Sequence, residues 1–114
     1  MSYDVTLVEK ATDGTDRELF YANHTSNTAQ MWRDAGVNLK DFNGAPAATM
    51  VQPVRAAAHQ IAIRPADFVH HVPRRRDGVT PSIMNGTVES TVRFLLDIAD
   101  ACEAHPTATV EVTA

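Results

Sequence analysis

Histidines supply the side chains most able to hold a ligand in this sequence. They are His24, His59, His70, His71 and His105. A transition-metal site could take three of them together with Asp67 or Asp77. However, adjacent His70 and His71 are expected to point to different sides of a helix or strand, and no two histidines have the i, i+4 spacing that places both rings on one helical face. We therefore expect no metal site and no cofactor.

An arginine run follows the histidine pair and is the sequence's only cluster of positive charge. Planar guanidinium groups suit phosphates or an acidic protein surface. The surrounding stretch contains Pro73, Gly78 and Pro81, which predict a long loop, where binding function tends to concentrate. We take this loop, from His70 to Asp77, as the first candidate site, for an acidic ligand. Its candidate residues are His70, His71, Arg74, Arg75 and Arg76.

A second polar stretch, Asn23 to Thr28, is rich in side chains that cap helices. Asn27 followed by Gln30 resembles a capping box, so we expect a helix to begin there, with Trp32 in the core. The same side chains could form a hydrogen-bonding pocket, although a strand-to-helix turn needs such residues for its own backbone. The secondary candidate cluster is Asn23, His24, Thr25, Asn27 and Trp32.

Cys102 and His105 lie three residues apart, a spacing that makes them neighbours on a helix and suggests a thiolate with a base. Cys102 falls on an apolar face near the end of its helix, where the helix dipole raises the pKa of a thiol, which argues against a nucleophile. The sequence has no glycine-rich phosphate loop, serine nucleophile motif or carboxylate pair. We therefore expect no catalytic residues and no enzyme.

The elements that position these residues are most strongly patterned at the C-terminus. Apolar residues from Thr87 to His105 recur at the spacing of an amphipathic helix. The expected buried face is Val88, Val92, Leu95, Leu96, Ala99 and Cys102. After Pro106, which ends this helix, apolar and polar residues alternate from Thr107 to Thr113. This period of two predicts a half-buried strand.

The N-terminus predicts a hairpin. Tyr3, Val5 and Leu7 alternate with polar residues, and a second short run, Glu18-Leu19-Phe20-Tyr21, follows the turn residues Asp13-Gly14. Because a two-stranded hairpin is barely stable alone, we expect the C-terminal strand to be its third member.

The middle of the chain predicts further helices. One begins at Pro46 and is kinked or divided at Pro53, because proline removes a backbone donor and clashes with the preceding turn. A short helix begins at Pro65, with Phe68 and Val69 facing inward. The predicted fold class is α+β: a small three-stranded sheet, made of the N-terminal hairpin and the C-terminal strand, packed by three to five helices.

The composition limits the classes of protein to which this chain can belong. The chain has 114 residues, 44% of them hydrophobic and 21% charged, which predicts one globular domain over residues 1–114. Its net charge of -4 argues against nucleic acid as the main partner. The single cysteine excludes an internal disulfide and fits a reducing cytoplasm. The sequence shows no export signal and no apolar run long enough for a membrane span.

Two blocks of the sequence carry a resemblance. They are Asn23-His24-Thr25-Ser26-Asn27 with Met31 to Gly36, and Ala101 to Val112. Both resemble small uncharacterised proteins of tailed bacteriophages, especially those that infect actinobacteria. That group often has a segment rich in Asn-Pro, Asn-Gly and Gly-Trp-Gly before the last helix, and residues 72–86 here keep only Asn85-Gly86. The resemblance implies a phage gene expressed in a bacterial cytoplasm, and it implies no reaction, cofactor or catalytic residue.

We therefore expect a small non-catalytic phage protein that binds a host or phage macromolecule in the bacterial cytoplasm. A protein is the favoured partner, nucleic acid or nucleotide is less favoured, and association into a homo-oligomer stays open. One alternative is a domain that binds or sequesters a nucleotide or other small molecule with the Arg74–Arg76 loop. A more remote alternative is a metal-dependent enzyme.

Overall fold

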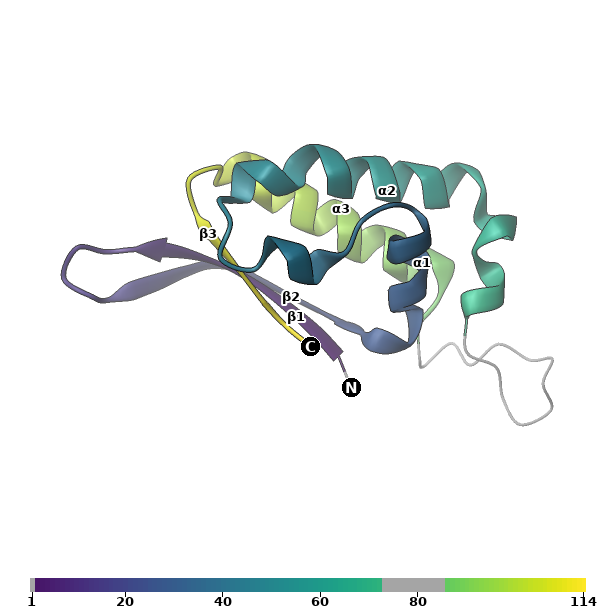
Figure 1. Cartoon of the computed structure of the whole chain (residues 1–114), viewed down its shortest axis with the longest axis horizontal. Helices are drawn as coiled ribbons and strands as arrows, with labels where there is room; N and C mark the ends of the chain where they lie inside the picture. The colour runs from purple at the N-terminus through teal and green to yellow at the C-terminus, as the bar shows by residue number, and fades with distance from the viewer. Residues whose placement is uncertain (1, 73–85) are drawn as a thin grey trace.

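The computed structural model describes residues 2–72 and 86–114. Within these residues the chain forms three strands and three α-helices: β1 (Ser2–Lys10), β2 (Asp16–Thr25), α1 (Ala29–Asp34), α2 (Val51–Ile63), α3 (Val88–Ala104) and β3 (Thr109–Thr113). Short 3₁₀ helices lie at Ser26–Thr28, Leu39–Phe42, Ala47–Met50, Pro65–Asp67 and Val69–His71. The helices lie on one side of the sheet, and the β1–β2 hairpin extends beyond them (Figure 1). The predicted α+β class is confirmed.

The sheet is antiparallel and has the strand order β2-β1-β3. Val5 of β1 pairs with Ala22 on one side and with Val112 on the other. The two ends of the chain therefore meet in one sheet, as the hairpin and the C-terminal strand predict. The outer edge of β3 is also paired, because Gly44 N–H donates to the Val110 carbonyl at 2.7 Å and Val110 N–H donates to the Ala45 carbonyl at 2.9 Å.

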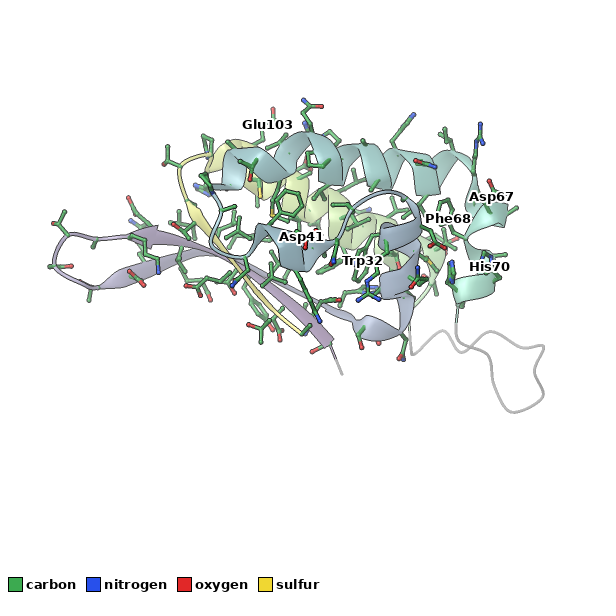
Figure 2. The ribbon with its side chains drawn as sticks, in the orientation of Figure 1. Trp32, Asp41, Asp67, Phe68, His70 and Glu103 are labelled. Atoms are coloured by element: carbon green, nitrogen blue, oxygen red, sulfur yellow. The ribbon has the colours of Figure 1, made fainter. Side chains whose placement is uncertain are left out.

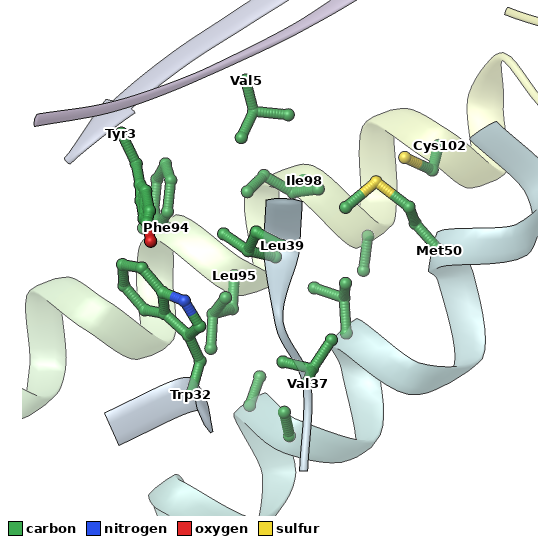
Figure 3. Packing of buried hydrophobic residues seen from close by; sticks show 14 of the residues in the cluster. Tyr3, Val5, Trp32, Val37, Leu39, Met50, Phe94, Leu95, Ile98 and Cys102 are labelled. Carbon is green, nitrogen blue, oxygen red and sulfur yellow. The ribbon is translucent and has the colours of Figure 1, made fainter. Parts of the chain in front are cut away.

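Helix α3 packs on the sheet through the side chains of Phe94, Leu95 and Ile98, which are buried with Val5 of β1 (Figure 3). The predicted helix is confirmed, but its predicted buried face is partly wrong. Phe94 and Ile98 were not expected on that face, and three of the residues expected there are only half buried. These are Val88, Val92 and Leu96.

Pro53 does not divide α2. It is the third residue of the helix, where the backbone N–H would have no partner within the helix, so the missing donor costs little. The 3₁₀ turn Ala47–Met50 leads directly into α2. Helix α2 then buries one stripe in the same core as α3. The stripe consists of Val54, Ala57, Ala58 and Ile61.

Helix α1 places Trp32 in the core, fully buried against two other rings. The Tyr3 ring centroid lies 5.1 Å from that of Trp32, and the Phe94 centroid lies 5.7 Å away (Figure 3). The predicted capping box of Asn27 and Gln30 does not form: the Asn27 backbone N–H instead donates to Thr25 Oγ1 at 3.2 Å.

The short turns after α2 follow the prediction in part. Pro65 begins a 3₁₀ helix, and Phe68 is buried as expected. Val69 was expected to face inward, yet its side chain is 43% exposed. The reason is that the chain does not continue as one helix here but forms two separate 3₁₀ turns, which changes the direction of the side chains that follow Phe68.

Candidate functional site

His24 lies where the end of β2 meets the start of α3. Its Nδ1 atom is 3.1 Å from the Thr25 carbonyl oxygen, and its Nε2 atom is 2.9 Å from the Ser90 hydroxyl. Burial lowers the pKa of His24, which favours the neutral ring. Thr28 Oγ1 also lies 3.3 Å from Nδ1, and Ser90 Oγ lies 3.2 Å from the Thr87 carbonyl, so His24 belongs to a hydrogen-bond network that links β2 to the start of α3. The ring stacks on Phe94, with 5.1 Å between centroids.

Ser90 belongs to the capping box of α3. Its Oγ accepts a hydrogen bond from the Thr87 backbone N–H at 2.8 Å, and Thr87 Oγ1 accepts one from the Ser90 N–H at 3.0 Å. Gly86 packs beside them, and a Cβ there would lie 2.7 Å from Thr25 Cγ2 and 3.2 Å from the His24 ring. A serine beside a histidine can form an activated nucleophile. Here the Ser90 hydroxyl already takes part in the cap of α3, and the His24 ring stacks on Phe94, so we interpret the pair as a structural connection between sheet and helix.

The other members of the secondary candidate cluster lie apart from this connection. Asn23 donates to Asp4 Oδ1 at 2.8 Å, and Tyr21 donates to the same oxygen at 2.6 Å. Both hydrogen bonds lower the pKa of Asp4, and the bond from Tyr21 has the larger effect. Asn27 is exposed. The structure thus brings His24 and Thr25 together near Trp32 and separates Asn23 and Asn27 from them.

A second polar group forms at the end of α1. His71 Nε2 lies 2.6 Å from Asp34 Oδ2, although the two residues are 37 positions apart. The rings of His70 and His71 lie side by side, with 3.9 Å between centroids, so the expectation that they point to different sides is wrong. Hydrogen bonds from Gln30 and His71 lower the pKa of Asp34, and the bond from Gln30 has the larger effect. His70 and Asp67 both lie on the 3₁₀ turns that follow α2 (Figure 2).

The arginines of the first candidate site, Arg74, Arg75 and Arg76, lie outside the described residues. The described part of that loop is the histidine pair, of which His70 is exposed and His71 is half buried. The predicted attraction of an acidic ligand to this loop therefore stays a prediction.

An open groove of about 450 Å³ runs between the end of α2 and the outer side of α3. Its apolar lining comes from the half-buried α3 residues Val88, Val92 and Leu96, which face Ala62 and Pro65. These three α3 residues were expected in the core, so the groove was not predicted. The available signal was that α3 has more apolar residues than one core face requires.

Acidic side chains predominate among the polar residues that line this groove. The polar lining residues are Glu89, Arg93, Asp97 and Asp100. Nearby Arg55 pairs with Asp100 at 3.0 Å and with Glu103 at 2.5 Å, so it offsets Asp100 and leaves Glu89 and Asp97 against Arg93. A ligand in the groove would therefore meet apolar side chains with negative charge at their border.

Cys102 lies in the core, where burial raises the pKa of its thiol to about 11. The thiol is therefore protonated at neutral pH, and a protonated thiol is a poor nucleophile. Its burial among apolar side chains also keeps it away from solvent.

Comparison of the chain with protein-family models, curated proteins and solved structures finds no match. Among the residues that the structure describes, no helix combines the length and the apolar character that crossing a membrane requires.

Proposed function

We propose that this protein is a small non-catalytic binding domain that holds an amphipathic helix of a partner protein in the groove between α2 and α3. The main support is the stripe of Val88, Val92 and Leu96. Phe94, Leu95 and Ile98 of α3 are buried in the core, whereas the three stripe residues pack against the core and stay half exposed on the groove side. Partly exposed apolar rows of this kind are typical of interaction surfaces.

A helix fits this groove better than an extended peptide or a small ligand. Val88, Val92 and Leu96 are spaced four residues apart, so they recur about every 6 Å along α3 and span about 12 Å. A partner helix with apolar residues at i, i+3 or i+4, and i+7 presents anchors at a similar spacing. The groove is bounded by two helices, and a third helix can pack against both.

The charge at the border of the groove defines the partner further. Glu89 and Asp97 line the groove with one base, Arg93, and a third acid, Asp100, is paired with Arg55. A partner helix that has lysine or arginine beside its apolar stripe would complement this border, and the attraction would weaken as salt is added. Hydrophobic contact would supply most of the affinity, since exposed ion pairs contribute little.

The resemblance to phage proteins supplies the setting that we propose. In that setting a phage gene product acts on a host or phage protein in the bacterial cytoplasm. A protein partner also agrees with the acidic net charge of -4, which disfavours a phosphate backbone.

Two matched α2 variants test this proposal. Ala62 and Ala56 are both exposed on α2, but only Ala62 lines the groove. Ala62→Arg should place a long cation in the groove and block a basic helix, whereas Ala56→Arg should not. Each protein would be immobilised and exposed to bacterial lysate. We expect at least one protein to be retained by the wild type and by Ala56→Arg and to be lost, by about tenfold or more, from Ala62→Arg.

Equal recovery from all three proteins would contradict the proposal. A wild-type dimer that Ala62→Arg dissociates would also contradict it, because the groove would then bind a second copy of this chain. Size-exclusion chromatography detects that outcome, and circular dichroism confirms that both variants are folded.

A further inference from the structure

Asp34, His70 and His71 bring three potential metal ligands to one point on the surface. One ligand atom from each residue can be chosen so that all three lie within 4.8 Å of one another. Asp34 belongs to α1, and the two histidines belong to the 3₁₀ turn Val69–His71. We propose that this triad binds a divalent first-row transition-metal ion, for which Zn²⁺ is the probe.

The ligand types define the class of ion. Two imidazole nitrogens and one carboxylate oxygen suit zinc, cobalt, nickel or iron(II), whereas calcium and magnesium favour sites made of oxygen ligands. Three protein ligands leave at least one coordination position for water or another ligand. The triad is therefore expected to bind zinc more strongly than magnesium.

The backbone that presents the histidines is held in place independently of a metal. Phe68 and Val72, which flank the 3₁₀ turn, are 5% and 7% exposed. His71 N–H donates to the Phe68 carbonyl, and Val72 N–H donates to the Val69 carbonyl, both at 3.0 Å. A turn that is fixed in this way reduces the entropy lost when a ligand binds.

Asp34 is held in place as well. Gln30 Nε2 donates to Asp34 Oδ1 at 2.7 Å. This bond orients the carboxylate while its second oxygen, Oδ2, faces His71. Hydrogen bonds of this kind position ligands in known metal sites.

Metal binding requires only small movements of these side chains. With metal–ligand bonds of about 2.0 to 2.1 Å and tetrahedral angles, ligand atoms lie about 3.3 Å apart. The His71–Asp34 contact of 2.6 Å would widen, and the other separations, at most 4.8 Å, would close. Both changes are on the order of 1 Å, within reach of side-chain rotation. The ion would replace the hydrogen bond between His71 and Asp34.

His70 distinguishes a metal site from a simple Asp–His pair. The pair needs only His71 and Asp34, whereas a three-ligand site needs the second ring. Loss of zinc binding in His70→Ala would therefore show that the neighbouring ring takes part.

Isothermal titration of the full chain with Zn²⁺, after dialysis against a chelator, tests the site. We expect one ion per chain, and at least a tenfold weaker affinity in each of His70→Ala, His71→Ala and Asp34→Asn. His59→Ala is the matched control, because His59 is an exposed histidine outside this group. Its affinity should equal that of the wild type.

Zinc binding that survives His70→Ala, or that falls equally in His59→Ala, would overturn the proposal and indicate adventitious binding to surface imidazoles. Absence of binding to the wild type would overturn it directly. Circular dichroism establishes that each variant is folded. The Ala62→Arg groove variant should bind zinc like the wild type, so failure of this site and failure of the docking groove can be distinguished.

Discussion

The imidazole ring of His24 stacks on the ring of Phe94, with 5.1 Å between centroids and 30° between planes. This contact joins the end of β2 to α3, and the contact of His24 Nε2 with the Ser90 hydroxyl at 2.9 Å reinforces it. Burial lowers the pKa of His24 and so favours the neutral imidazole in this connection. The connection should therefore depend on pH.

We expect stability to fall as the pH decreases below about 6.5, the ordinary pKa of histidine. Burial lowers the pKa of folded His24, so over this interval the unfolded chain binds the proton first and is favoured. Above the pKa that His24 has in the unfolded chain, His24 is neutral in both states, and its contribution to stability is fully present. Urea midpoints at about pH 7.5 and about pH 5 measure this change. His24→Gln should show a smaller loss of stability than the wild type between the two pH values.

His59→Gln is the control for general histidine effects, since His59 is exposed on α2. The stability of this variant should depend on pH in the same way as that of the wild type. If His24→Gln also keeps that dependence, His24 is not the group responsible, and burial of its neutral ring does not cause the change of stability with pH.

Gly86 should tolerate a methyl group poorly. Its φ is +100°, and an added Cβ would approach Thr25 Cγ2 to 2.7 Å and Thr28 Cγ2 to 2.9 Å. Gly36 has nearly the same φ, +101°, but no atom within 4 Å of the added carbon. Gly36→Ala should therefore cost only the backbone strain, about 1 to 2 kcal/mol. Gly86→Ala should cost about 1 to 3 kcal/mol more, because of the clash. Denaturant unfolding of both variants measures the difference, and equal losses would contradict the close packing around His24.

Trp32 should be among the most costly side chains to remove. It is fully buried against Tyr3 and Phe94, so Trp32→Ala should destabilise the fold by about 3 to 5 kcal/mol. Its indole N–H has no hydrogen-bond partner among the residues that the structure describes. Trp32→Phe removes that buried donor and keeps one ring, so its cost should be about 1 to 2 kcal/mol. Urea unfolding compares the two, and equal costs would contradict the packing of this ring against Tyr3 and Phe94.

The parts of the fold predicted correctly are those defined by local periodicity. Helix α3 and the alternation in β1 and β3 each bury one face, and that pattern is visible in a short window of sequence. The end of β2 is different, because Asn23 to Thr25 are polar and become a strand by pairing with Asp4 to Ser2 of β1. The polar residues alone predict a helix cap at this point, whereas pairing with β1 makes the same residues the end of a strand.

The groove and the histidine triad could not be predicted for a related reason. Val92 and Leu96 have the same helical spacing as core residues, and only the position of α2 shows that they border a groove. The contact between His71 and Asp34 depends on how α1 and the turn Val69–His71 meet in space. Neither relationship has a signature in the spacing of neighbouring residues.

Photocrosslinking from the border of the groove tests the docking proposal most directly. A benzophenone amino acid would replace Arg93, which lines the groove, and in a control protein it would replace Arg17, which lies exposed on β2 outside the groove. Both replacements remove an arginine and leave the apolar stripe of α3 intact. After irradiation in bacterial lysate, mass spectrometry identifies the crosslinked peptides. We expect position 93 to yield a partner segment with apolar residues at helical spacing and adjacent lysine or arginine, and position 17 not to yield it. Crosslinks from position 93 that lead only to a second copy of this chain, or the same peptides from both positions, would contradict the account.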